Sequence, residues 1–493
     1  MNRALPLMDW ATSQPRRPAV VADGRTYSYR ELADAVLVAA ARLADRVGPG
    51  TRVGLYLDST PEFVIYEYAV FHLGGVVVPI NRAARANEVD DSADQLDLEL
   101  VVVDGPLSLD NTAVVQAGSE GVAAAAAPRP ARRAPDDHAM ILQTSGSTGR
   151  PKGVALSFRN LTANYDATPR WLGVGRDDRI LLALPLFNTY ALNQGVNLAM
   201  NTGATLRLVR RFGVEAMARA LEEFRPTFLP LVPTMLTRLA DAGVRHDEPL
   251  TLNIGASASP SRLAADAWQV FPQATLLFGY GLTEATAIVT MNRVGTVAEN
   301  NGDYSSAGRA VNGVEVRVDS IDTTGRGEVL VRGDSVFAGY VGTADLAPVE
   351  NGWLRTGDIG VLMDGVLTIV DRKRDLIIRG GQNIYPGELE RALTQHDAVL
   401  EAAVVGIPDS DLGEVPTAFV VLRSGAEADP TALLEWLTER VAGFKVPAAV
   451  TVIEAMPKTP TGKIQKRSLL DGIPMYGDRC TSPRSSSAPC SAD

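Results

Sequence analysis

Short runs of β-branched and aliphatic residues alternate with helical patterns through the first three-quarters of this chain. Residues 52–57 (RVGLYL), 75–80 and 98–103 are typical of strands, and residues 62–73 are typical of a helix. The same alternation returns later, with strands expected at 179–184, 205–209, 227–231 and 252–254 and helices at 214–224, 233–242 and 260–270. Such alternation predicts an α/β fold of parallel sheets with helices packed on their faces.

The pattern changes twice toward the C-terminus. From about residue 314 short strands come with glycine turns and few helices, so we expect a small β-rich subdomain at about 314–372 within a large N-terminal region, residues 1–372. A glycine-rich loop, helices expected near 387–394 and at 430–442, and further strands then predict a separate, small α+β domain over residues 373–473. The tail, 474–493, is rich in Ser and Pro and is expected to be disordered.

Composition and charge argue against several classes of function. The formal charge of −11, from 47 basic and 58 acidic side chains, disfavours a general nucleic-acid binder. Cys480 and Cys490 are the only cysteines, too few for a disulfide framework or a Cys-built zinc site. The N-terminus lacks the apolar segment of a signal peptide, and the most apolar long window, 180–200, is interrupted by polar residues. We therefore expect a soluble, cytoplasmic protein with no membrane span and no nucleic-acid partner.

The sharpest local motif is TSGSTGRPKG at residues 144–153. Its glycines allow backbone N–H groups to converge on one point, and its hydroxyl side chains add hydrogen-bond donors. Lys152 supplies a mobile positive charge. Such a loop suits a polyphosphate, although the spacing is not that of a Walker A motif; a flexible Gly/Ser loop with a chance lysine is the plainer alternative. The residues concerned are Thr144, Ser145, Gly146, Ser147, Thr148, Gly149 and Lys152.

Four segments in one order resemble the adenylate-forming superfamily of acyl-CoA synthetases, aryl-CoA ligases and peptide-synthetase adenylation domains. They are the loop at 144–153, GYGLTEA at 279–285, TGD at 356–358 followed by DRKRDLIIRGGQNIYPGELE at 371–390, and PKTPTGKIQK at 457–466. The resemblance extends from about residue 18 to residue 470. It implies an ATP-dependent ligase that uses Mg²⁺, activates an acid as an acyl-adenylate and releases pyrophosphate, with a C-terminal domain that moves during the reaction.

The resemblance also implies roles that single residues would not reveal. By residue type alone, Glu284 is an ordinary surface acid, Asp358 a turn former and Lys463 an exposed loop lysine. In the family pattern Glu284 is the magnesium ligand and Thr283 contacts a phosphate, while Asp358 and Arg372 hold the ribose. Lys463, on the C-terminal domain, bridges the substrate carboxylate and the α-phosphate. The adenine site is lined by Gly255, Ala256, Ser257, Gly279 and Tyr280.

The second half of the implied reaction transfers the acid to a thiol. In relatives that use coenzyme A, the positions of Gly380 and Gly381 line the pantetheine channel. The small domain swings about a hinge that falls here at Arg374, where relatives usually carry Asp or Lys. The activity implied is therefore acid–CoA ligation, with coenzyme A as the second substrate.

The substrate segment PLFNTYALNQG, residues 185–195, departs from the family pattern. Most acyl-CoA synthetases carry a histidine at the position of Asn188, whose amide can neither become cationic nor act as a base. Asn193 and Gln194 add polarity nearby. The pocket is expected to be lined by Phe187, Asn188, Tyr190 and Gly281, with no Arg or Lys in its walls. A neutral wall favours a monocarboxylate, medium aliphatic or aromatic, over a dicarboxylate.

Three other activities stay open. Asn188 is compatible with an ATP-dependent diazotase that activates nitrite for an aromatic amine, as some relatives in natural-product pathways do. The acid could instead be passed to a separate carrier protein, although the absence of an acidic residue in 185–195 weighs against an amino acid as substrate. A non-catalytic nucleotide-binding relative is disfavoured, because the functional positions of the family all carry the expected residue types.

Overall fold

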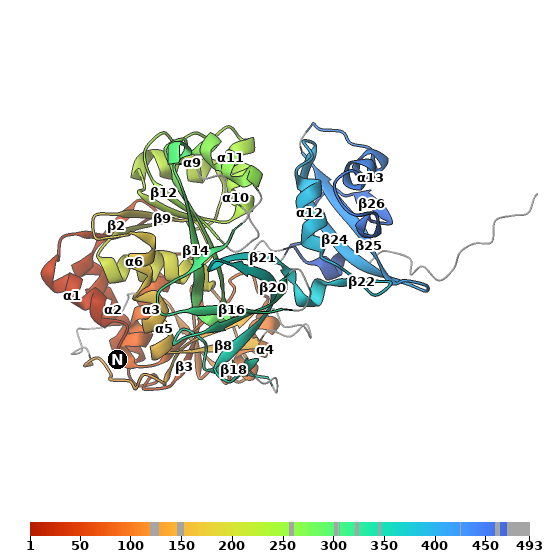
Figure 1. Cartoon of the computed structure of the whole chain (residues 1–493). Helices are drawn as coiled ribbons and strands as arrows, with labels where there is room; N and C mark the ends of the chain where they lie inside the picture. The colour runs from red at the N-terminus through yellow and green to blue at the C-terminus, as the bar shows by residue number, and fades with distance from the viewer. Residues whose placement is uncertain are drawn as a thin grey trace, which may run out of the picture. The chain divides into compact units, whose positions relative to one another are not determined.

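The computed structural model describes residues 1–118, 128–144, 152–255, 261–299, 304, 306–320, 325–343, 347–423, 425–458 and 464–470. They belong to two compact units, of which the larger begins at Met1 and ends at Ile369 and the smaller begins at Val370 (Figure 1). The domain limits drawn from the sequence stay predictions, and the expected tail at 474–493 lies outside the described residues.

A 14-stranded sheet extends through the larger unit, and one part of it is parallel. The parallel strands, in spatial order, are β1 (Pro18–Ala22), β10 (Thr205–Leu208), β9 (Arg179–Leu182), β11 (Phe228–Leu231), β12 (Thr251–Ile254) and β13 (Thr275–Leu282). One face is covered by α9 (Val214–Phe224), α10 (Pro233–Asp241) and α11 (Ser261–Val270). Leu181 of β9 packs on this face, while its neighbours Ile180 and Leu182 pack on the other, as the two-residue period of a strand requires.

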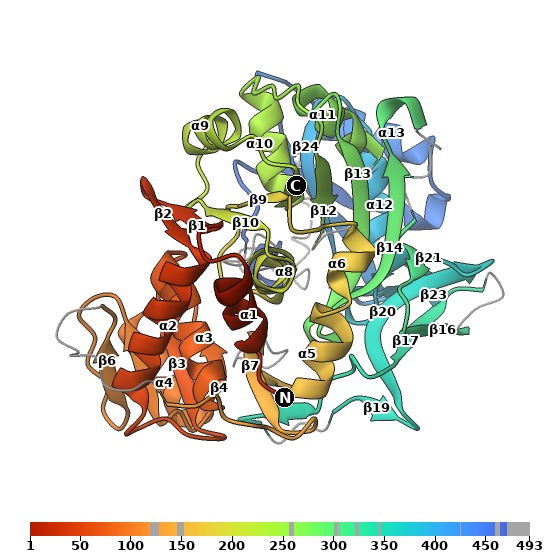
Figure 2. The same ribbon diagram turned by 90° about the vertical axis from the view of Figure 1, so that its left-hand side faces the viewer.

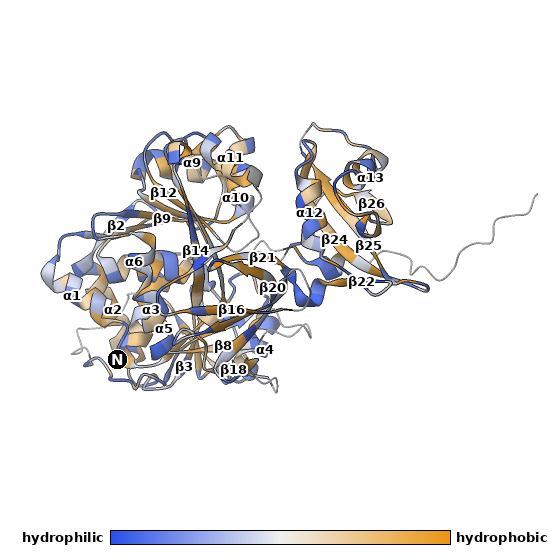
Figure 3. Cartoon of the chain, viewed as in Figure 1, coloured by the Kyte–Doolittle hydropathy of each residue, from blue (hydrophilic) through white to orange (hydrophobic). Residues whose placement is uncertain are grey.

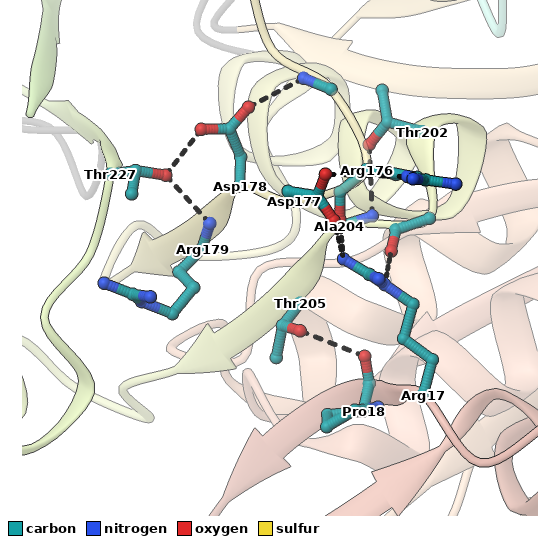
Figure 4. Close-up of polar contacts among 12 residues, drawn as sticks. Arg17, Pro18, Arg176, Asp177, Asp178, Arg179, Thr202, Ala204, Thr205 and Thr227 are labelled. Carbon is teal, nitrogen blue, oxygen red and sulfur yellow. Dashed lines mark hydrogen bonds and ion pairs between the residues drawn. The ribbon is translucent and has the colours of Figure 1, made fainter. Parts of the chain in front are cut away.

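The N-terminal hairpin, β1 and β2 (Arg25–Ser28), joins this sheet at β10 (Figure 4). Thr205 Oγ1 donates to the carbonyl of Pro18 at 3.1 Å. On the adjacent strands the Thr227 hydroxyl donates to Asp178 Oδ1 at 2.6 Å and accepts from the amide of Arg179 at 2.9 Å. These hydrogen bonds align the first residues of β9 and β11. The carboxyl ends of the two strands therefore lie at the same edge of the sheet.

Helices from the N-terminal region pack beside the hairpin (Figure 2). They are α1 (Leu5–Ser13), α2 (Tyr29–Leu43) and α8 (Leu198–Thr202). A capping box starts α2, because Glu31 N donates to Ser28 Oγ at 3.2 Å while Ser28 N donates to Glu31 Oε2 at 2.8 Å. Tyr29 then hydrogen-bonds through its hydroxyl to the carbonyls of Ala199 and Ala204, which ties α2 to α8.

A second, seven-stranded sheet completes the larger unit. Its order is β18 (Gly339–Val341), β8 (Lys152–Ser157), β7 (His138–Thr144), β4 (Val76–Pro79), β3 (Arg52–Tyr56), β5 (Leu100–Val103) and β6 (Ala113–Gln116). Helix α3 (Pro61–Leu73) is buried along almost its whole length, and α4 (Ala86–Gln95) covers the other face. The left-handed Gly74, at φ +77°, ends α3.

The strand-rich segment predicted from residue 314 onward continues the 14-stranded sheet rather than forming a separate sheet. The antiparallel part of this sheet begins before residue 314, with β14 (Ala287–Gly295) and β15 (Gly308–Ala310). It continues with β16 (Glu315–Ser320), β17 (Gly327–Arg332), β19 (Val349–Glu350), β20 (Trp353–Met363) and β21 (Val366–Arg372), while β18 pairs with β8 in the seven-stranded sheet. The sheet is thus parallel where helices connect its strands and antiparallel where hairpins do.

The smaller unit has a five-stranded sheet with helices on one face. Its elements are β22 (Ile377–Arg379), β23 (Gln382–Ile384), α12 (Pro386–Thr394), β24 (Val399–Asp409), β25 (Gly413–Leu422), α13 (Pro430–Thr438) and β26 (Ala449–Val452). Its two long strands, β24 and β25, are hydrophobic along much of their length (Figure 3). The helix expected over 430–442 ends at Thr438, because the chain turns there to bring β26 parallel to β25.

The predicted α/β class, with a large N-terminal and a small C-terminal part, is confirmed. Most expected strands and helices lie within two residues of their predicted ends; helix α9 matches at both. Among the described residues no helix combines the length and the apolar character needed to cross a membrane.

Candidate active site

The phosphate-loop motif connects β7 to β8, and the two described ends of the loop face each other. Thr144, the last residue of β7, lies opposite Lys152, the first residue of β8, in the antiparallel register. Several predicted site residues lie outside the described part of the chain: Ser145, Gly146, Ser147, Thr148, Gly149, Ala256, Ser257 and Lys463.

Tyr340 of β18 lies between two of the predicted nucleotide-site residues. The Nζ atom of Lys152 is 5.2 Å from the centroid of the Tyr340 ring, within the range of a cation–π contact. The hydroxyl of the same tyrosine donates to Glu284 Oε1 at 3.1 Å. The structure therefore brings a cation suited to phosphate and a carboxylate suited to Mg²⁺ to one aromatic side chain. No motif marked Tyr340 in the sequence; only the pairing of β18 with β8 reveals it.

The main chain of Glu284 also contacts the segment that carries Tyr340. Thr283 and Glu284 lie in the 3₁₀ turn η2 (Thr283–Ala285), directly after β13. The amide of Phe337 donates to the Glu284 carbonyl at 2.8 Å, and the Phe337 ring meets the Tyr340 ring edge-on with centroids 4.9 Å apart. Both the main chain and the carboxylate of Glu284 thus contact one short segment, residues 337–340.

Tyr280 and Asp358 form a second polar contact in the predicted nucleotide site. The phenol of Tyr280 donates to Asp358 Oδ2 at 2.6 Å, although the two motifs are 78 residues apart. Asp358 N in turn donates to Thr356 Oγ1 at 3.1 Å, across the left-handed Gly357 at φ +73°. A hydrogen bond to a charged carboxylate is a strong one, so it fixes the position of the ribose-binding candidate relative to β13.

Tyr190 packs against the end of β12, next to the predicted adenine site. Its hydroxyl donates to the Asn253 carbonyl at 2.8 Å, and burial raises the pKa of this phenol, which therefore stays protonated. A Cβ added at Gly255 would lie 3.0 Å from the Tyr190 ring. The ring of Tyr190 therefore packs against Gly255, while its hydroxyl is hydrogen-bonded to the sheet.

Gly279 and Gly281 belong to β13 and pair with β14. A Cβ at Gly281 would lie only 1.6 Å from the Ala287 carbonyl oxygen, whereas one at Gly279 would be in ordinary contact at 3.4 Å. Only glycine fits at 281, because the turn of η2 brings the backbone of β14 against it.

The polar residues of the substrate segment divide into two groups. Phe187 and Asn188 are partly exposed, and the Asn188 amide does not cap the following helix α7 (Thr189–Ala191). Asn193 and Gln194, in the π-helical turn η1 (Leu192–Asn197), are buried instead. Their amide groups hydrogen-bond to Asn164 and Asn253, while Asn193 Oδ1 has no hydrogen-bond partner among the described residues.

The smaller unit carries the predicted hinge and coenzyme A positions. Gly380 and Gly381 form the two-residue turn between β22 and β23, with φ +55° and +79°, as a type I′ turn requires. Arg374 lies in the 3₁₀ turn η4 (Lys373–Asp375) and is exposed, as is Arg372. Arg372 belongs to this unit, whereas Asp358, its proposed ribose partner, belongs to the larger one.

A half-buried ion pair anchors the segment that follows Lys463. Lys466 Nζ lies 2.8 Å from Glu390 Oε1, and Glu390 also accepts from the amide of Val404 at 2.8 Å. Burial raises the pKa of the Glu390 carboxyl. Burial also disfavours the ammonium of Lys466, but attraction to Glu390 and Asp371 outweighs it and raises its pKa. The sequence did not single out this pair.

The residues present fit Mg²⁺ and ATP. Mg²⁺ usually binds through one or two carboxylates together with substrate phosphates, and Glu284 offers an oriented carboxylate of this kind. In the described part of the chain no group of three or more His, Cys, Asp or Glu side chains gathers as a metal cage.

Comparison with known proteins identifies the family. Residues 7–341 match the family described as AMP-binding enzyme, and residues 388–463 match the AMP-binding enzyme C-terminal domain. A 3-[(3aS,4S,7aS)-7a-methyl-1,5-dioxo-octahydro-1H-inden-4-yl]propanoyl:CoA ligase of Mycobacterium tuberculosis is 35% identical over 92% of this chain and 96% of its own length. A feruloyl-CoA synthase of Amycolatopsis sp is 34% identical over the same shares of the two chains.

Solved structures agree with the sequence relatives. An o-succinylbenzoate CoA synthetase from Bacillus subtilis, bound to its acyl-adenylate intermediate, superimposes with a TM-score of 0.85 at 28% identity, over 95% of this chain and 98% of that one. The same enzyme bound to ATP and magnesium ion gives 0.83 at 28% identity, over 94% and 99%. The predicted superfamily and the predicted ATP-dependent acid–CoA ligase activity are confirmed, while the roles of individual residues stay predictions. The chain belongs to the AMP-binding enzyme family of adenylate-forming acid–CoA ligases.

Proposed function

We propose that this protein activates a ring-bearing monocarboxylic acid with Mg·ATP and transfers the acyl group to coenzyme A. The proposal is carried by the side chains at the positions expected to line the acid pocket. Phe187, Asn188, Tyr190 and Gly281 carry no charge, and the side chains of Phe187, Asn188 and Tyr190 are partly exposed. A second carboxylate buried in such a pocket would lack a cationic partner, which is costly.

The names of the relatives support a cyclic acid. The Mycobacterium tuberculosis enzyme is named for a bicyclic propanoyl group and the Amycolatopsis enzyme for ferulate. A 2-succinylbenzoate–CoA ligase of Bacillus velezensis, named for a dicarboxylate, is 33% identical over 94% of this chain. The neutral walls of the present pocket favour the first kind of substrate.

The reaction proceeds in two balanced steps. The acid carboxylate attacks the α-phosphorus of ATP, the bond to the β-phosphate oxygen breaks, and pyrophosphate leaves. The coenzyme A thiol then releases its proton to solvent and forms a C–S bond to the acyl carbon, and the C–O bond to the phosphate of AMP breaks, so that AMP leaves with its electron pair. Mg²⁺, when bound, neutralises phosphate charge, and Glu284 would hold it.

Each site residue has a role in this scheme. Lys152 and Thr283 bind phosphate oxygens, and Asp358 with Arg372 orients the ribose. Lys463 brings the carboxylate and the α-phosphate together and stabilises the charge that grows on phosphorus oxygens. The remaining assignments are Thr144, Ser145, Gly146, Ser147, Thr148, Gly149, Gly255, Ala256, Ser257, Gly279 and Tyr280 for ATP, and Gly380 and Gly381 for the thiol channel, with Arg374 as hinge.

The proposal is tested by acid-dependent ATP–pyrophosphate exchange, followed by mass analysis of the coenzyme A product. Bicyclic and aryl propanoates should support exchange, and matched dicarboxylates of the same ring size should not. Faster exchange with the dicarboxylates would contradict the assignment of the pocket.

Asn188→Asp is a nearly isosteric variant that introduces a negative charge beside the acid. It should raise KM for the acid about tenfold or more, without a matching change in KM for ATP. Asn188→His is the matched control, since it restores the residue usual in acyl-CoA synthetases. An effect of Asn188→Asp on ATP alone would show that this residue does not face the acid.

The partly exposed Asn188 also favours a second candidate function, activation of nitrite for an aromatic amine. The exchange assay therefore includes nitrite, with and without an aminobenzoate. Nitrite-dependent ATP cleavage with a diazo product would support it, and exchange with carboxylic acids only would exclude it. A phosphopantetheinylated carrier protein, offered in place of coenzyme A, tests whether the acyl group is transferred to a carrier protein instead.

A further inference from the structure

Thr286 has a backbone conformation that is rare for its residue type. Its φ is +70°, in the left-handed region, and its side chain is fully buried. A β-branched residue is strained there, and such strain persists only where the surroundings hold it. Thr286 directly follows η2, the turn that carries Thr283 and Glu284.

All three polar groups of Thr286 are engaged. Its amide donates to the Thr283 carbonyl at 2.9 Å, and its carbonyl accepts from Thr189 Oγ1 at 2.8 Å. Its hydroxyl donates to the Ser335 carbonyl at 2.6 Å. One of these contacts lies within its own turn and two come from distant segments of the chain, so together they fix both the backbone and the side chain of this residue.

Helix α5 (Phe158–Tyr165) hydrogen-bonds to the backbone on both sides of Thr286. Asn164 Nδ2 donates to the Ile288 carbonyl at 2.8 Å and to the Ala285 carbonyl at 3.5 Å, on either side of Thr286. Four residues earlier, on the same helix face, Asn160 Nδ2 donates to the carbonyls of Asp334 and Val336 at 2.8 and 2.7 Å. The two segments that meet at Thr286 are thus both attached to one helix.

We propose that Thr286 is a positioning residue that orients the Thr283–Glu284 turn and links it to the acid pocket through Thr189. The proposal rests on the proposed function, in which that turn binds phosphate and Mg²⁺. Thr189 lies between Asn188 and Tyr190, so its hydrogen bond to the Thr286 carbonyl joins the pocket wall to the turn. Without its hydroxyl contact, residue 286 can leave the left-handed conformation, and the carboxylate of Glu284 then turns away from its present direction.

The experiment compares substitutions that keep either the shape or the hydroxyl. Thr286→Val keeps the shape and removes the hydroxyl, whereas Thr286→Ser keeps the hydroxyl. Thr290→Val is the matched control, because Thr290 is also fully buried and donates to a backbone carbonyl, that of Ala307, at 2.6 Å. Thr290 lies within β14 rather than at the turn and does not have positive φ.

Thr286→Val should lower kcat for pyrophosphate exchange about tenfold, because the Thr283–Glu284 turn is then no longer held in its present orientation. It should also raise the Mg²⁺ concentration needed for half-maximal ATP binding, measured by calorimetry. Thr286→Ser should remain close to wild type. Thr290→Val should lower only the denaturation midpoint.

Equal kinetic and Mg²⁺ effects in Thr286→Val and Thr290→Val would overturn the proposal, because both would then report stability alone. If Thr286→Val does not fold, Thr189→Val decides, since it removes only the contact to the Thr286 carbonyl and the neighbouring Tyr165 hydroxyl. A wild-type protein that binds Mg·ATP but activates no acid would refute the proposed function while leaving the calorimetric test in force.

Discussion

Glu67 gives this fold a pH dependence that can be calculated. It lies in α3 and is fully buried. Burial raises the pKa of its carboxyl to about 8, although a hydrogen bond from Asn197 and attraction to Arg3 both act to lower it. Asn197 Nδ2 donates to Oε1 at 3.4 Å, while Oε2 has no partner among the described residues. The folded protein therefore carries a proton on Glu67 at neutral pH.

The size of the effect follows from the difference between folded and unfolded chains. The unfolded glutamate titrates at 4.5 and the folded one at about 8, so the stability associated with the protonated group is fully present below about pH 4.5 and is lost as the pH rises to about 8. At about 1.4 kcal/mol per pH unit, the native state at pH 7 is about 3 kcal/mol less stable than it is below about pH 4.5, as far as Glu67 is concerned. Glu67→Gln, neutral at every pH, should remove this loss.

The assay is urea unfolding of both proteins between about pH 5 and about pH 8. The stability of Glu67→Gln relative to wild type should rise with pH at about 1.4 kcal/mol per unit and level off above about pH 8. Glu328→Gln is the control, because Glu328 is buried but lies 3.2 Å from Arg355 Nη2, and its loss should destabilise. A difference between Glu67→Gln and wild type that does not change with pH would refute the reasoning.

Three further predictions concern the candidate active site. Gly281→Ala should lower the free energy of unfolding by about 3 kcal/mol or prevent folding, because its Cβ would overlap the Ala287 carbonyl; denaturant titration measures this. Tyr280→Phe should raise KM for ATP about threefold to tenfold with a smaller change in kcat, since it loses the hydroxyl that orients Asp358; a raised KM for the acid alone would contradict it. Lys463→Ala should lower pyrophosphate exchange about a hundredfold or more while ATP binding persists, and near-normal exchange would reject the assigned role.

Much of the fold was predictable because the relevant patterns are local. The limits of β3, α3, α9 and α12 follow from runs of apolar residues and from the glycines and prolines beside them. The addition of β1 and β2 to the sheet at β10 was not predictable, since the pairing joins Val20 to Leu206 across the whole first half of the larger unit.

The candidate site shows the same division. Glycine, hydroxyl and lysine spacing predicted a phosphate loop, and the resemblance of four motifs named the residues that would accompany it. Tyr340 and Asn164 escaped notice, because neither stands in a motif and each acts through a contact with a distant segment.

The sequence by itself determined the residue types, the local elements and the family of this protein. The tertiary structure alone decided which side chains meet: Tyr280 with Asp358, Tyr340 with Lys152 and Glu284, and Thr286 with Thr189 and Ser335. The physical reason is that helix and strand preferences depend on neighbours a few residues away. Hydrogen bonds at a site depend instead on strand order and register, which bring together segments separated by scores of residues.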